Sequence, residues 1–182
     1  MIDFFISIPM ELKIIILAGL FIGVLDYIKR FFLKLVRKED NNAKKVVDKT
    51  MRVKKILKRE LSSRKKYKTT YKDIKHYFNI INKTIFNNKL SPFNDVLIKK
   101  IYKDESKKFC YGQVVAREFK RKGTRVYHLE MLPEYHNKKE FVDTLGHEMV
   151  HLYQMANKGD TGNHNKLFYS FRPKLNEIGL DL

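Results

Sequence analysis

The chain has 182 residues, a formal net charge of +18 at pH 7 and 43% hydrophobic residues. This length suits one ordinary domain with a modest appendage, and the hydrophobic fraction is sufficient for a packed core. The single cysteine, Cys110, excludes an intrachain disulfide and a Cys-x-x-Cys zinc ribbon. The excess of Lys and Arg favours a polyanionic partner, either DNA or another nucleic acid, or the anionic face of a membrane.

The first segment, residues 1–36, is the most apolar part of the chain. Its uncharged run, residues 14–25, would span only about 18 Å as a helix, short of a bilayer core of roughly 30 Å. Extending the run back to Phe4 gives enough length but includes a proline and two charged residues. We predict membrane association through residues 4–25, spanning or lying in the interface, with a core or oligomerisation helix as the alternative. The basic residues that follow would keep the remainder of the chain cytoplasmic.

The second segment, residues 37–68, is dense in Lys and Arg. Hydrophobic residues recur in it at roughly helical spacing, at Val46, Val47, Val53, Ile56, Leu57 and Leu61. This spacing predicts a basic helical linker that is amphipathic. Such a helix could lie on a membrane surface or on nucleic acid, or it could be a solvated connection.

The third segment, residues 69–182, has the pattern of a compact α+β domain. Thr70 with Asp73 resembles a capping box at the start of a helix. One face of this helix is predicted to carry Tyr71, Ile74, Phe78, Ile81 and Ile85. Turn-forming residues at Asn87-Asn88 and Ser91-Pro92 are expected to end it.

Three strand-like runs follow, at residues 96–102, 109–119 and 124–131, all rich in Val, Ile, Tyr and Phe. Lys122-Gly123 is a hairpin signal between the last two. Two helices are predicted after the strands. This order predicts a small antiparallel three-stranded sheet with helices packed on one face.

The residues that carry chemistry are His147-Glu148-Met149-Val150-His151. They fall in a predicted helix from about Lys138 to Lys158, with Asn137 as the N-cap. Helical residues four apart lie about 40° apart around the axis, so both imidazoles can reach one metal ion. Glu148 lies beside them without being a ligand, where a general base could take a proton from a metal-activated water.

The opposite side of this helix is predicted to pack on the core. It carries Phe141, Leu145, Met149, Leu152 and Ala156. The histidine face is therefore free to look into a cleft.

His164 is the predicted third ligand, because catalytic zinc usually has three protein ligands and leaves one position open. The residues before it, 159–163, are turn formers that can bring the chain back to the metal. Phe168, Phe171, Leu175 and Ile178 would pack the following helix onto the domain.

Weaker candidates surround this set. His136, Tyr135 and Tyr153 are near enough in sequence to stabilise an oxyanion. Asp143, Asp160 and Asn163 are candidates to orient an imidazole. His76 and His128 are expected to be packing or surface residues.

The stretches TLGHEMVHLYQ at 144–154, NHNKLF at 163–168 and NKTIFNNKLSPF at 82–93 resemble motifs of the SprT-like metallopeptidases. The resemblance extends from about residue 70 to residue 182. It implies zinc on His147, His151 and His164, with Glu148 as the catalytic acid/base. Asn165 departs from the glycine that is common in the family after the third histidine. The family's frequent C-terminal cysteine-rich ribbon is absent from these 182 residues.

The resemblance and the charge together predict a zinc metalloendopeptidase that acts on protein substrates associated with DNA. Two alternatives remain open at this point. One is a membrane-anchored metallopeptidase that acts on envelope or membrane proteins. The other is a catalytically silent, zinc-stapled module that binds nucleic acid or membrane; the presence of Glu148 argues against it, because a structural zinc site gains nothing from that carboxylate.

Overall fold

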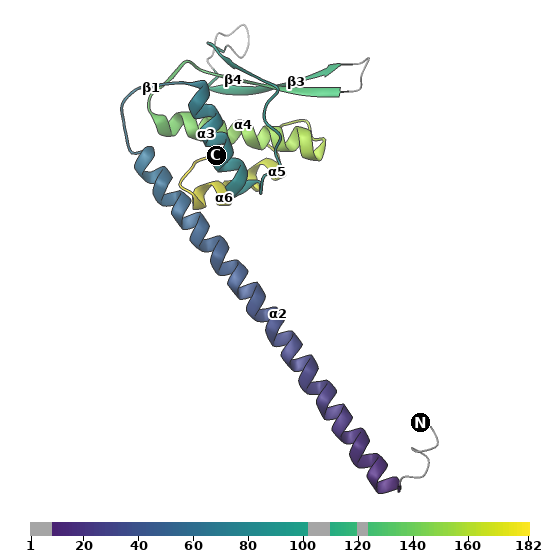
Figure 1. The fold of residues 1–182 in the computed structure, drawn as a ribbon. Helices are drawn as coiled ribbons and strands as arrows, with labels where there is room; N and C mark the ends of the chain where they lie inside the picture. Colours follow the sequence, from purple (N-terminus) through teal and green to yellow (C-terminus); the bar gives the residue numbers. More distant parts are fainter. Residues whose placement is uncertain (1–8, 102–109, 120–123) are drawn as a thin grey trace. The chain divides into compact units, whose positions relative to one another are not determined.

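The computed structural model describes residues 9–101, 110–119 and 124–182 (Figure 1). It divides into two compact units, Met1–Asp48 and Lys49–Leu182. Helix α2, Met10–Glu60, contributes to both, so residues 10–36 of the apolar segment and most of the basic linker belong to one helix. Within the described residues, no helix has the length and apolar character needed to cross a membrane. The part of the predicted anchor before residue 9 lies outside the described residues.

In the first unit, α2 is amphipathic where its side chains are described. Large hydrophobic side chains are exposed at Val24, Leu25, Tyr27, Ile28, Phe31, Phe32, Leu33, Leu35 and Val36. At about 100° per residue, all of these except Leu33 fall within one half of the helix, and most of the basic residues between Lys29 and Lys38 fall within the other half. Arg30 on the charged side forms an i,i+4 ion pair with Asp26 at 2.8 Å.

In the second unit, two long helices form the centre of the domain. Helix α3, Tyr71–Ile85, begins at the predicted capping residue, because the Thr70 side chain accepts a hydrogen bond from the Asp73 backbone N–H. Ile74, Phe78, Ile81 and Ile85 are buried as predicted. Tyr71, on the same face but in the first turn, is exposed, and Tyr77, outside the predicted set, is buried.

The strands form two small sheets. Strands β2 (Asp95–Ile98), β3 (Gly112–Phe119) and β4 (Thr124–Met131) form a three-stranded sheet in the order β2-β4-β3. Strands β1 (Tyr67–Lys68) and β5 (Glu134–Tyr135) form a two-stranded antiparallel pair that the sequence analysis did not predict.

The α+β class is confirmed, but the all-antiparallel sheet is corrected to a mixed one. β3 and β4 pair antiparallel, whereas β2 pairs parallel to β4. The antiparallel prediction assumed that strands adjacent in sequence are adjacent in space. Instead β4 lies in the middle, where its Leu129 and Met131 are completely buried. The predicted turn at Lys122-Gly123 lies outside the described residues.

Helix α4, Lys138–Lys158, lies between the other layers of the domain. In Figure 1 the three-stranded sheet lies on one side of α4, and the short helices α5 (Lys166–Tyr169) and α6 (Arg172–Glu177) lie on the other. Phe141, Leu145, Met149 and Leu152 are buried as predicted. Ala156 is exposed, contrary to the prediction, because it lies in the last turn beyond the packed region.

Candidate metal centre

Helix α4 places His147, Glu148 and His151 by local rules alone. Its first turn is capped by Asn137, whose side-chain oxygen accepts a hydrogen bond of 2.9 Å from the Glu140 backbone N–H. Its last turn ends at Gly159, which adopts the left-handed conformation with φ of 63°. Both boundaries are those predicted from the sequence.

His164 reaches the same point from the loop after α4. Gly159 and Gly162 both have positive φ, and they reverse the chain. Asn165 caps α5 by accepting a hydrogen bond of 3.1 Å from the Phe168 backbone N–H. This bond fixes the residue that follows His164.

The three imidazoles converge through their Nε2 atoms. The Nε2 of His151 lies 3.2 Å from that of His147 and 3.2 Å from that of His164, and the third separation is 3.1 Å. These residues form a group that could hold a metal ion. Tetrahedral zinc with Zn–N bonds of about 2.0–2.1 Å separates its nitrogen ligands by about 3.3 Å. The donor set and its spacing therefore fit a divalent ion such as zinc.

The ring of Phe168 packs against all three imidazoles. Its ring centroid lies 4.9 Å from that of His147, 4.8 Å from that of His151 and 4.4 Å from that of His164. The Phe168 side chain is almost completely buried. Its burial was predicted from the sequence, but its contact with the three candidate ligands was not.

Burial lowers the basicity of the helical imidazoles. Burial, followed by the proximity of His151 and His164, lowers the pKa of His147 to about 4. Burial also lowers the pKa of His151, and the hydrogen bond with Gln154 opposes this shift. Neutral imidazoles are the form that binds a metal, so this environment favours the ligand state at neutral pH.

Glu148 is buried beside the imidazoles and lies outside the group of metal-ligand candidates that the described residues form. Burial raises the pKa of its carboxyl group to about 8, and a hydrogen bond from the Val114 backbone acts in the opposite direction. A carboxyl with this pKa can both accept and release a proton near neutral pH.

Strand β3 approaches this carboxylate very closely. A Cβ atom at Gly112 would lie 2.8 Å from Cγ2 of Thr144 and 3.2 Å from Cγ of Glu148. Only glycine allows this approach without a shift of the neighbours. Gly112 thus brings the edge of β3, with the Val114 backbone N–H, to Glu148.

A cavity of about 450 Å³ opens beside the candidate centre, and His147 and Glu148 form part of its wall. The other lining residues come from the start of β3, the first half of α4 and the last residues of the chain. Among them are Gly112, Thr144 and Asp143. Glu148 therefore borders a cavity whose volume is within the range of ligand-binding pockets.

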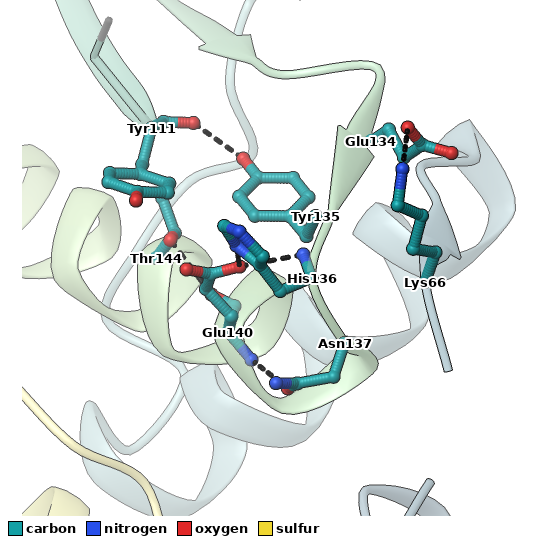
Figure 2. Close-up of polar contacts among 8 residues, drawn as sticks. All are labelled: Lys66, Tyr111, Glu134, Tyr135, His136, Asn137, Glu140 and Thr144. Atoms are coloured by element: carbon teal, nitrogen blue, oxygen red, sulfur yellow. Dashed lines mark hydrogen bonds and ion pairs between the residues drawn. The ribbon is translucent and has the colours of Figure 1, made fainter. Parts of the chain in front are cut away.

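The predicted oxyanion candidates have other partners. The Tyr135 hydroxyl donates a hydrogen bond of 2.5 Å to the Tyr111 carbonyl (Figure 2). His136 is paired with Glu140, whose carboxylate accepts from both its backbone N–H and its ring (Figure 2). Tyr153 packs against Phe86 and Phe171. Within the described part of the chain, none of these three candidates lines the cavity.

The predicted imidazole-orienting residues are also placed differently. Asp143 interacts with Lys139 and with the Asp181 backbone N–H, not with an imidazole. Asp160 and Asn163 are connected to an imidazole only through Gln154, which donates hydrogen bonds to the Asp160 carboxylate and to the Asn163 carbonyl. Gln154 itself contacts His151, a role that the sequence analysis missed. Of the two remaining histidines, His76 is near Glu60 and His128 is near Asp95.

Comparisons were made with protein-family models, with curated proteins and with solved structures. None of the three found a match to this chain. The functional interpretation therefore depends on the geometry of the three imidazoles and Glu148.

Proposed function

We propose that this chain is a zinc-dependent metalloendopeptidase of the SprT-like type. The observation that carries the proposal is the triangle of Nε2 atoms, 3.1–3.2 Å apart, with the buried Glu148 next to it in α4. His147, His151 and His164 would hold the ion. A zinc ion bound there supplies a Lewis acid and an acidified water.

Glu148 is the proposed general base and general acid. Its carboxylate takes the proton of the attacking water and later delivers it to the leaving amine. The Val114 backbone hydrogen bond orients the carboxylate for this task. Burial of this carboxyl, which raises its pKa in the metal-free protein, favours the protonated form that Glu148 needs between the two steps.

Strand β3 is the proposed site at which a substrate backbone pairs. On β4, Glu130, Leu129 and His128 are opposite Gln113, Val114 and Val115, and the Val114 backbone also hydrogen-bonds the Glu148 carboxyl group. Alternate residues of β3 therefore present backbone groups at its outer edge. Among the described residues, no strand pairs with this edge. An extended peptide added there would pass directly over Glu148.

The decisive experiment combines metal analysis with Glu148→Gln. The full chain, purified without added metal, is expected to contain close to one zinc per molecule and to cleave an unfolded protein substrate. Glu148→Gln should retain the zinc and lose cleavage. Glu177→Gln, at an exposed position on α6, is the matched control and should remain active.

An active Glu148→Gln protein would refute the assigned role of Glu148. Zinc in the wild type without cleavage of any tested protein would instead identify a zinc-stapled binding module.

DNA-associated proteins are the substrate class that the charge favours. The chain has 38 Lys and Arg against 20 Asp and Glu. A DNA-stimulated protease should lose its stimulation as salt rises, because phosphate contacts release counterions. Cleavage measured with and without DNA at about 50 and 200 mM salt tests this, since affinity changes strongly over that range. Equal rates in all four conditions would count against DNA as the partner.

A membrane-associated peptidase is the second candidate, and the exposed apolar arc of α2 favours it. Phosphate contacts with nucleic acid would not bury the exposed Phe31, Phe32 and Val36, whereas an anionic lipid interface would bury such an apolar face and pair with the basic one. The catalytic domain would then be held at the cytoplasmic face of the membrane. Sedimentation with phosphatidylcholine vesicles, with and without phosphatidylserine, tests this candidate. Phe31→Asp with Phe32→Asp should abolish binding to the anionic vesicles, and binding that survives this change would exclude the arc as the contact.

A further inference from the structure

The amide group of Gln154 connects two parts of the candidate metal centre that are separate in the chain. Gln154 lies one turn after His151 and two turns after His147 on α4, and its side chain is completely buried. A buried amide must satisfy both its oxygen and its two N–H groups, because an unpaired buried polar atom is costly. Every atom of this amide has a partner, and the partners lie on both sides of the site.

The nitrogen of the amide faces the loop that carries His164. Nε2 of Gln154 donates to the Asn163 carbonyl at 2.8 Å and to Oδ1 of Asn165 at 3.1 Å, with Asp160 near at 3.4 Å. The Asn163 carbonyl can only accept. Oδ1 of Asn165 also accepts from the Phe168 backbone N–H, so its identity as an oxygen is fixed.

This orientation determines the tautomer of His151. Because the amide nitrogen faces the loop, Oε1 of Gln154 faces Nδ1 of His151, at 3.0 Å. An amide oxygen only accepts, so Nδ1 of His151 must carry the hydrogen. The Nε2 of His151 is then left with its lone pair, directed at the Nε2 atoms of His147 and His164. In water a free imidazole has no such constraint.

We infer that Gln154 is a positioning residue of the metal centre. It holds His151 in the tautomer that binds a metal, and it ties that histidine to the two residues on either side of His164. The inference depends on the proposed metal site, and it concerns metal binding rather than any step of cleavage. Its consequence is that the third ligand is held in place before the metal arrives.

The test compares Gln154→Met with wild type in the full chain. Met has a similar length and fills the buried volume, but it cannot accept from Nδ1 of His151 or donate to the loop. Zinc affinity, measured by competition with a chromogenic chelator, is expected to fall about 10- to 100-fold, as for loss of a residue that orients a metal-bound histidine. In the metal-free protein, ¹⁵N NMR of the imidazoles should show His151 protonated at Nδ1 in wild type and a tautomer mixture in Gln154→Met.

Asn82→Ala is the matched control. Asn82 is also a buried amide, and it makes two hydrogen bonds to the Leu90 backbone. Its loss should destabilise the domain without changing zinc affinity or the His151 tautomer. If Gln154→Met does not fold, Gln154→Asn is used, because its shorter side chain keeps the amide but cannot reach both partners.

The outcomes separate this inference from the proposed function. Wild type that binds no zinc would overturn both. Wild type that binds zinc, with either Gln154 variant within about threefold of its affinity and with an unchanged tautomer, would overturn only the role of Gln154, since loss of an orienting partner costs tenfold or more.

Discussion

The ring of Phe168 lies 4.4 Å from the imidazole of His164, centroid to centroid, and it also touches the other two candidate ligands. One buried apolar side chain therefore contacts all three imidazoles and restricts their positions. Packing of this kind limits the rotamers of the ligands and so preorganises the site.

Phe168→Leu is expected to weaken zinc binding more than its effect on stability explains. Leu is smaller and flexible, so it leaves space beneath the imidazoles and allows them to rotate. The matched control is Phe171→Leu, because Phe171 is also buried but packs on Phe86 and Tyr153. Both variants should lose about 1–3 kcal/mol in urea denaturation. Only Phe168→Leu should bind zinc more weakly in chelator competition; equal affinities in the two variants would contradict the support role.

Gly112→Ala should damage both the fold and the reaction. Its Cβ would lie 2.8 Å from Cγ2 of Thr144, so β3 or α4 must shift, at a cost of about 1–3 kcal/mol. The shift would move the Val114 N–H away from Glu148 and lower the rate of cleavage. Adding Thr144→Ser removes the clashing methyl group and keeps the hydroxyl that donates to the Glu140 carbonyl. The double variant should recover much of the loss, whereas no recovery would show that the clash lies elsewhere.

Glu148→Gln should stabilise the metal-free protein at alkaline pH. The folded pKa of Glu148, about 8, lies above the ordinary value of 4.5, so the folded state binds the proton more tightly. The favourable contribution of this group is complete below pH 4.5 and is lost between pH 4.5 and 8. Urea denaturation in the presence of a chelator should show a gain of about 3–5 kcal/mol for Glu148→Gln at pH 8 and almost none at pH 4.5. A pH-independent difference would mean that Glu148 is not buried as described.

His147 should make the metal-free protein sensitive to acid. Its folded pKa, about 4, lies below the ordinary value of 6.5, so the unfolded state takes up the proton first. The contribution of His147 to stability is present above pH 6.5 and is lost as pH falls toward 4. Because the side chain is partly exposed, we expect a loss of about 2 kcal/mol. His147→Asn should lose less stability than wild type between pH 7 and pH 4 in chelator; parallel curves would refute the assignment.

The two long helices of the domain could be predicted because their determinants are local. Thr70 and Asn137 cap their first turns, and Gly159 ends α4, all within a few residues of the helices themselves. The pairing of β2 with β4 could not be predicted in the same way. It joins Val96 to Leu129, which are far apart in sequence, and its direction depends on which strand takes the centre of the sheet.

In the candidate site, too, the features set by local sequence could be predicted and those set by distant contacts could not. The i,i+4 spacing of His147 and His151 is sufficient to predict that both face one side of α4. The contacts of Phe168 and Gln154 depend on how residues 159–165 fold back, which no periodicity reveals. Phe168 lies in a stretch that resembles a family motif, and its packing was predicted. Its contact with the imidazoles was not predicted; the signal for it in the sequence was its position four residues after His164.

The ligand set is compact along the chain, because His151 and His164 are 13 residues apart and the span from His147 is 17 residues. A metal ion here is a cross-link across a short loop, and closing a short loop removes little entropy from the unfolded chain. The core around Leu129 and Met131 is built without it. Chelation should therefore accelerate hydrogen exchange in residues 159–169 while β4 keeps its protection. The ion would add to the hydrogen bonds by which Gln154 already holds the loop of His164, and the domain would remain folded without it.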